Sequence, residues 1–137
     1  MQVTTHLNFS GNCEAAFQFY AETLGGKITM MMTQGESPMG DTVPTEMKGK
    51  IMHASLEMPG GANLMGADHP QGKKVQPTGF CVSIQVKDAA EAERLFKGLS
   101  KDGKVQMEFQ KTFWSPGFGM CTDKFDIPWM VNCVTAA

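Results

Sequence analysis

His53 and Glu57 lie at alternating positions of one stretch of the chain, with Ser55 between them. Alternating residues of a strand point to the same face, so the carboxylate of Glu57 could hold the imidazole charged or fix its tautomer. His53 would then be a general acid or base near neutral pH, and the two residues are our catalytic candidates. The alternative is a hydrogen-bonded structural histidine, which we favour because no nucleophile accompanies the pair.

The same alternation in other stretches predicts a larger polar face, opposite a more apolar face that would pack beneath a helix. Its members are His6, Asn8, His53, Ser55, Glu57, Cys81, Ser83, Gln85, Glu108, Gln110 and Asn132. This face could be the solvated floor of a cleft, a polar ligand pocket or a dimer surface. Trp114 is added because so large a ring usually anchors a core or a pocket wall. The predicted ligand-binding residues are His6, Asn8, His53, Ser55, Glu57, Cys81, Ser83, Glu108, Trp114 and Asn132.

The sulfur-containing residues predict no familiar site. The four cysteines are widely spaced and form no CxxC or zinc-finger pattern. Cys81 would be nucleophilic only beside a cation, and no Lys or Arg is close in sequence, so an inert strand thiol is expected. The twelve methionines indicate an adaptable apolar interior, or a pocket that tolerates varied ligands.

Composition excludes several classes of function. With 137 residues, 42% hydrophobic and 19% charged, the chain fits one domain, or two very small modules that share a core. A formal net charge of −2 makes nucleic acid a poor candidate partner. The first residues lack the features of a signal peptide and no apolar run could span a membrane, so we expect a cytoplasmic protein.

Periodicity and turn residues predict the same order of elements twice. Strands are expected at 3–9, 27–33, 51–58, 62–67, 78–86, 105–112 and 117–122 and from 127 onward, with helices at 13–24 and from the cap Asp88 to Leu99. Asn12 is the expected N-cap of the first helix. Met52 is expected on the apolar face of its strand with Ala54 and Leu56. The long polar loop 34–49 could be a lid or a surface insertion.

The predicted fold class is therefore α+β, with two βαβββ modules forming a curved mixed sheet around a cleft and helices on the outer face. The modules would span 1–68 and 78–137 within one structural domain, joined by a linker at 69–77.

Four segments resemble the vicinal oxygen chelate superfamily, which includes glyoxalase I and fosfomycin- and bleomycin-resistance proteins. They are LNFSGNCEAAFQFY (7–20), IMHA (51–54), TFW (112–114) and FGMCTDKFDIPWMVN (118–132). Within the superfamily they resemble the PhnB-like group, often labelled 3-demethylubiquinone-9 3-methyltransferase-like. No glycine-rich loop follows the first strand to hold an adenosyl cofactor, so we discard methyl transfer.

In metal-dependent members of that superfamily, His and Glu ligands come from the first and last strands of each module. The resemblance places these positions at His6, Met65, Cys81 and Met130, with Thr5 replacing His6 if no gap is allowed. Only His6 is an ordinary ligand for a hard divalent ion, so we predict no metal site; a divalent metal is possible but unsupported by this ligand set. A soft copper site from these side chains is conceivable, but buried Met and Cys are usually core.

Two functions follow from the resemblance and the missing ligands. The first is a PhnB-like protein that binds a small molecule in the cleft without the usual metal. The alternative is a metal-dependent enzyme of isomerase, lyase or dioxygenase type that uses His6. The resemblance also implies a homodimer, because relatives of this fold commonly pair modules across subunits.

Overall fold

The structure is a computed structural model that describes residues 1–69 and 76–134. The chain divides into two compact units, Met1–Val75 and Gln76–Ala137, and each is described by itself. The predicted linker 69–77 falls largely on residues 70–75, outside the described residues. Whether both units form one structural domain stays a prediction.

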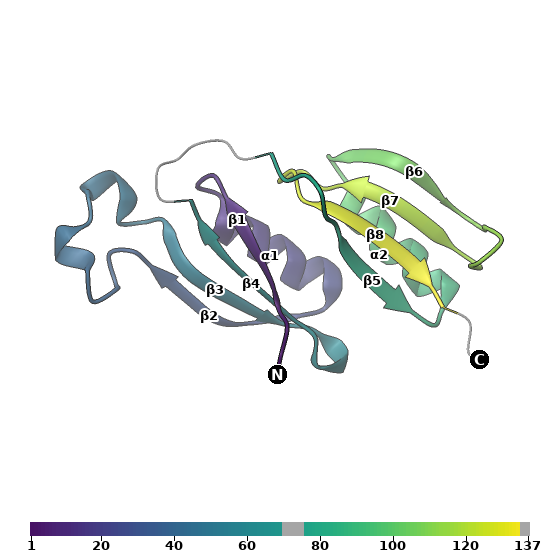
Figure 1. Ribbon diagram of the computed structural model, residues 1–137, viewed down its shortest axis with the longest axis horizontal. Coiled ribbons are helices and arrows are strands. Elements are labelled where there is room, and N and C mark those ends of the chain that lie inside the picture. The colour runs from purple at the N-terminus through teal and green to yellow at the C-terminus, as the bar shows by residue number, and fades with distance from the viewer. Residues whose placement is uncertain (70–75, 135–137) are drawn as a thin grey trace. The chain divides into compact units, whose positions relative to one another are not determined.

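The first unit is a four-stranded mixed sheet covered by one helix (Figure 1). Its elements are β1 (Thr5–Phe9), α1 (Cys13–Leu24), β2 (Lys27–Thr33), β3 (Ile51–Glu57) and β4 (Asn63–Asp68). The strand order is β1-β4-β3-β2, with β1 parallel to β4 and the other pairs antiparallel. Short 3-10 turns lie at η1 (Gly40–Thr42), η2 (Thr45–Met47) and η3 (Pro59–Gly61).

Helix α1 forms because its apolar residues recur on one side and bury against the sheet. Phe17 and Tyr20 are fully buried there and pack against Phe9 of β1. Gly66 of β4 lies directly beneath the Phe17 ring, where a Cβ atom would lie 2.6 Å from the ring. The helix ends at Gly25, whose φ of 70° is left-handed and favours glycine.

The second unit repeats this topology. Its elements are β5 (Val82–Val86), α2 (Ala89–Ser100), β6 (Lys104–Gln110), β7 (Phe118–Thr122) and β8 (Pro128–Cys133). The order is β5-β8-β7-β6, with β5 parallel to β8 and the other pairs antiparallel. Leu95, Phe96 and Leu99 of α2 and Trp129 and Val131 of β8 are all buried in the core of this unit. The α+β prediction, with βαβββ repeated, is confirmed.

Several predicted boundaries are wrong, and one has a clear cause. The strand predicted at 78–86 begins only at Val82, because Gly79 has a φ of 84° that no strand accommodates. Cys81 therefore precedes β5 instead of lying within it. The strand predicted at 105–112 runs from Lys104 to Gln110. The strand predicted at 27–33 is confirmed, and the other strand ends agree or differ by at most two residues.

The predicted start of α1 at Cys13 is confirmed, with Asn12 at the N-cap position, but the expected cap by the Asn12 side chain is not formed; the cap predicted for α2 is confirmed. Asn12 makes no side-chain cap hydrogen bond. Asp68, at the end of β4, instead accepts hydrogen bonds from the backbone N–H groups of Gly11 (3.0 Å) and Cys13 (2.9 Å). In α2, Asp88 caps the helix by accepting from the N–H of Ala90 at 3.3 Å.

Neither α1 nor α2 has the length and apolar character needed to cross a membrane, and the rest of the described chain holds no such helix.

Candidate functional site

In the first unit, several predicted site residues share the sheet face that points away from α1. His6 pairs with Met65 and Asn8 with Ala67 along β1 and β4, while their neighbours Leu7 and Phe9 are buried beneath the helix. On β3, His53 and Ser55 have the same orientation, opposite the buried Ala54 and Leu56. The alternation in the sequence therefore places these polar side chains on one face.

His53 pairs with Ser55 instead of with the predicted carboxylate. The Nε2 atom of His53 lies 3.2 Å from the Oγ atom of Ser55. Glu57 is exposed at the end of β3 and makes no ion pair or hydrogen bond with His53 in the part of the chain that the structure describes. The structure therefore does not bring together the predicted pair of His53 and Glu57, and the imidazole has a hydroxyl as its partner instead.

In the second unit, Ser83 and Asn132 lie on the sheet face opposite α2. Ser83 pairs with Met130 across β5 and β8, while Asn132 pairs with Gln85. Glu108 is exposed on the edge strand β6. The half-exposed Trp114 lies in the segment before β7, with its ring centroid 5.3 Å from that of Phe118.

Because the two units share one topology, the strand pairing shows which residues of the first unit correspond to which residues of the second. His6 and Met65 are paired in the first unit, and Ser83 and Met130 are the matching pair in the second. The second-unit counterpart of His6 is therefore Ser83, and the predicted match of Cys81 to this position is wrong.

Neither pair of positions fits a hard divalent metal. The donors would be the imidazole of His6 and the thioether of Met65 in the first unit, and the hydroxyl of Ser83 and the thioether of Met130 in the second. Such ions prefer imidazole and carboxylate groups, and a thioether offers neither charge nor a hard donor atom. Within residues 1–69 and 76–134, no group of three His, Cys, Asp or Glu side chains could hold a metal ion.

Two of the buried thiols are chemically inert near neutral pH. Burial raises the pKa of Cys13 to about 12, with a further contribution from Asp68 and then Glu14. Burial likewise raises the pKa of Cys121 to about 12, assisted by Asp123. Both thiols are therefore protonated at pH 7 and are poor nucleophiles.

These shifts predict an alkaline loss of stability. A free thiol ionises near pH 9 in the unfolded chain but near pH 12 in the folded one, so the unfolded state releases protons first as the pH rises. The stability contribution is complete below pH 9 and is lost as the pH rises toward 12. Between pH 8 and pH 10 each thiol should lower the free energy of unfolding by about 1.4 kcal/mol. Urea unfolding of the wild type and of a Cys13→Ala/Cys121→Ala variant should show a shallower decline in the variant; equal declines would contradict the prediction.

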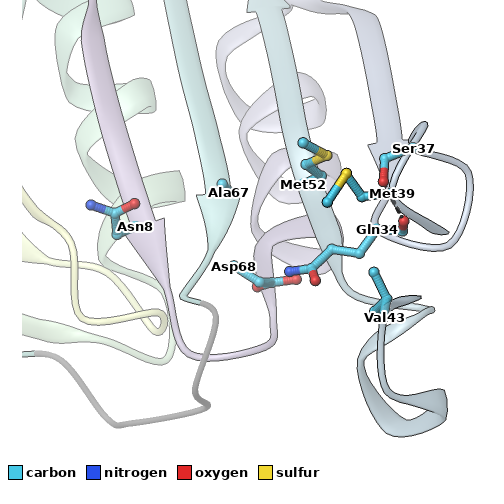
Figure 2. A pocket seen from close by; sticks show the side chains of 8 residues that line it. All are labelled: Asn8, Gln34, Ser37, Met39, Val43, Met52, Ala67 and Asp68. Atoms are coloured by element: carbon cyan, nitrogen blue, oxygen red, sulfur yellow. Dashed lines mark hydrogen bonds between the residues drawn. The ribbon is translucent and has the colours of Figure 1, made fainter. Parts of the chain in front are cut away.

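The structure also forms a pocket that the sequence did not predict as a set (Figure 2). It has a volume of about 400 Å³ and lies between the ends of β1, β3 and β4 and the loop 34–49. Its lining residues are Asn8, Gln34, Ser37, Met39, Val43, Met52, Ala67 and Asp68. Of these, only Asn8 was a predicted site residue.

Met52 enters the pocket because of a bulge in β3. Met32 of β2 pairs with His53, but the next residue, Thr33, pairs with Ile51, so β3 carries one extra residue. The bulge re-aims the side chains: Ile51 is buried in the core, whereas Met52 is 47% exposed. The prediction that Met52 belongs to the apolar core face is therefore wrong.

The loop 34–49 is held at its base by backbone hydrogen bonds. The N–H of Gln34 donates to the carbonyl of Lys50 (2.8 Å), and the N–H of Gly35 donates to the carbonyl of Lys48 (3.0 Å). The carbonyl of Gln34 also accepts the buried hydroxyl of Ser37 at 2.7 Å. These bonds close the loop at its base and give Gln34 a fixed backbone at the pocket rim.

A pair of glycine substitutions should show that this loop builds the pocket. A Cβ atom at Gly40 would overlap the carbonyl oxygen of Gly35, whereas at Gly49 it would meet open space. Gly40→Ala should cost on the order of 2 kcal/mol locally, relieved by opening of the loop while the core stays folded. Hydrogen exchange should therefore lose protection at Gln34 and Gly35 and keep it in α1. Gly49→Ala is the matched control; the same loss in both variants, or in neither, would contradict this role for Gly40.

Comparisons with known proteins agree with this fold. The model of the Glyoxalase/Bleomycin resistance protein/Dioxygenase superfamily matches residues 5–131. Protein YjdN of Escherichia coli (strain K12) is 34% identical over 142 residues, covering 98% of this chain and 96% of YjdN. Protein PA1353 from Pseudomonas aeruginosa is 43% identical in its crystal structure, with a TM-score of 0.88 and 99% of both chains covered.

A more distant neighbour supports the fold alone. The structure described as a putative 3-demethylubiquinone-9 3-methyltransferase, PhnB protein, from Bacillus cereus has a TM-score of 0.77 at 22% identity. It covers 98% of this chain and 100% of that one. With the matched family model and the repeated βαβββ topology, these findings show that the chain belongs to the glyoxalase/bleomycin resistance protein/dioxygenase superfamily.

Proposed function

We propose that the protein binds a small molecule in the pocket beneath the loop 34–49, without a metal held by the superfamily's usual ligand positions. The observation that carries the proposal is the pocket itself, where Met39, Val43 and Met52 offer apolar surface beside the amides of Asn8 and Gln34. Its volume of about 400 Å³ falls within the range of small-molecule sites. Methionine side chains adapt to ligands of different shape, which suits a binding protein.

The loop geometry supports the same proposal. A segment of sixteen residues that is polar in sequence would be an unusual surface insertion, and here it is closed at its base by hydrogen bonds. It supplies Gln34, Ser37, Met39 and Val43 to the pocket. The remainder of the pocket comes from strand ends, which provide a rigid floor.

A ligand screen read by NMR tests the proposal. Full-length protein carrying ¹³C-methyl methionine would be screened by thermal shift against a broad library, because a ligand that binds the folded state raises the melting temperature. Hits should shift the methyl signals of Met39 and Met52 and leave that of Met107, which is exposed in the second unit, unchanged. A library with no hit, or hits that shift only methionines outside the pocket, would overturn the proposal.

Replacement of His6, the only ordinary metal ligand among the four positions that the resemblance assigns, should leave the metal content of the protein unchanged. His6 is exposed and its paired residue on β4 is Met65, so it lacks a second hard donor on the neighbouring strand. Elemental analysis of the purified wild type and His6→Ala should therefore give equal metal content, within about 0.1 equivalent. A stoichiometric metal lost in the variant would instead support the enzyme alternative that uses His6.

We also propose that the protein is a homodimer. The superfamily resemblance supports this, as do the exposed apolar side chains of Met30, Val105 and Met107. Light scattering should give a mass twice that of the 14.9 kDa chain.

A further inference from the structure

The polar groups that line the pocket differ sharply in whether they are free to bind a ligand. Asp68 has little acceptor capacity left, because its carboxylate already accepts hydrogen bonds from the N–H groups of Gly11, Cys13 and Ile51. The hydroxyl of Ser37 donates to the carbonyl of Gln34. A ligand therefore cannot take a hydrogen bond from Ser37 without breaking this bond, and Asp68 can offer it only a remaining lone pair.

Two primary amides remain. In residues 1–69 and 76–134, no hydrogen bond engages the side-chain amide of Asn8 or that of Gln34. Asn8 approaches from β1, whereas Gln34 extends from the loop toward Asp68 (Figure 2). Each amide offers both donors and an acceptor, so together they suit a ligand that carries donor and acceptor groups of its own.

The charges around the pocket disfavour an anion. None of the eight lining residues is Lys, Arg or His. Near the start of α1, the N–H groups of Gly11 and Cys13 already donate to Asp68 and are not available to an anion. The pocket already holds the carboxylate of Asp68, and none of its lining side chains is a cation that could pair with a second negative charge, which disfavours an anion.

The apolar part of the pocket favours a flat ring. Met39 from the loop and Met52 from the β3 bulge both bring a thioether to the pocket, where the two side chains are drawn beside each other (Figure 2), and Val43 adds a branched apolar wall. Thioether sulfur makes favourable contacts with aromatic rings, and a mobile methionine adapts to the ring's position.

From these observations we propose that the pocket selects an uncharged or cationic planar aromatic molecule that carries a carbonyl or amide group, and that Gln34 is a specificity-determining residue for that group. This inference rests on the proposed function and names the chemical class of its ligand.

The test compares three probes with one ring system and different charge: 2-naphthamide, 2-naphthoate and 2-naphthylmethylammonium. Each is titrated into the full chain while the methyl signals of Met39 and Met52 are followed. We expect 2-naphthamide and the ammonium compound to shift both signals. We expect 2-naphthoate to bind at least about tenfold more weakly than 2-naphthamide. Binding of 2-naphthoate as tight as that of the amide would overturn the inference while leaving the proposed function intact.

Two variants isolate the role of the amide. Gln34→Met keeps the length of the side chain but removes its hydrogen-bonding groups. It should weaken the binding of 2-naphthamide by about fivefold and change the affinity for the ammonium probe little. Gln85→Met makes the same exchange at an exposed position of β5, outside the pocket, and should leave all affinities unchanged. Equal effects of Gln34→Met on both probes would overturn the role of Gln34. Failure of all three probes to shift the methyl signals of Met39 and Met52 would overturn the proposed ligand class. The thermal-shift screen of the broad library then tests separately whether the pocket binds a small molecule.

Discussion

Asp68→Asn should lower the free energy of unfolding by about 3 kcal/mol. In the native protein, Oδ1 of Asp68 accepts from the N–H groups of Gly11 (3.0 Å) and Cys13 (2.9 Å), while Oδ2 accepts from the N–H of Ile51 (2.8 Å). The side chain is 4% exposed, so water cannot replace a lost partner. One carboxylate thereby ties the turn before α1 and the first residue of β3 to the end of β4.

Asparagine retains only one of the two acceptor oxygens. If its oxygen faces Gly11 and Cys13, its NH₂ group faces the N–H of Ile51, and two buried donors are left opposed. The variant also loses the favourable interaction of a negative charge with the start of a helix. Both effects act in the same direction, and together they remove a large share of the stability of an ordinary domain.

Asp88→Asn is the matched control. Asp88 also caps a helix, but it is exposed and accepts one hydrogen bond, from the N–H of Ala90. Asparagine is an equally good N-cap, so this variant should stay within about 0.5 kcal/mol of the wild type. Urea unfolding of both variants measures the difference. Comparable losses, or a loss below about 1 kcal/mol for Asp68→Asn, would show that the buried hydrogen bonds of Asp68 contribute little.

Local patterns in the sequence were sufficient for the element order and for both helices. The bounds of α1 follow from its apolar repeat and from Gly25, and the cap of α2 follows from Asp88. The cap of α1 could not be found this way, because Asp68 lies 55 residues beyond Cys13 and reaches it only through the parallel pairing of β1 with β4. Asn12, the local candidate, has the right type at the right place and makes no cap hydrogen bond.

The pocket shows a similar limit. Strand alternation correctly placed Asn8 on the open face, but a bulge reverses alternation, and nothing in residues 51–54 marks the extra residue that turns Met52 outward. The loop 34–49 was recognisable as unusual from its length and polarity. Which of its side chains line the pocket depends on hydrogen bonds between its two ends, such as that from Gln34 to Lys50, and these are not visible as a sequence pattern.

Asp123→Asn should destabilise the second unit by about 3 kcal/mol, for a related reason in a different setting. Oδ1 of Asp123 accepts from the N–H groups of Phe125 (2.8 Å) and Ile127 (3.1 Å), and so holds the turn between β7 and β8. Oδ2 accepts from Nε1 of Trp129 at 2.8 Å. Asp123 and Trp129 are 2% and 1% exposed, so an asparagine NH₂ group facing the indole N–H would leave two buried donors opposed.

A double-mutant cycle separates the indole hydrogen bond from the turn. Trp129→Phe removes the indole donor, so the asparagine NH₂ group no longer opposes an N–H there, and Asp123→Asn should cost about 1 kcal/mol less in that background. Unfolding is followed by circular dichroism, because removal of Trp129 leaves only Trp114 as a tryptophan fluorophore. Additive losses in the two variants would mean that Asp123 stabilises the unit through the turn alone. A coupling of about 1 kcal/mol would show that the carboxylate joins the turn to the core, because Trp129 is among the largest fully buried side chains of the protein.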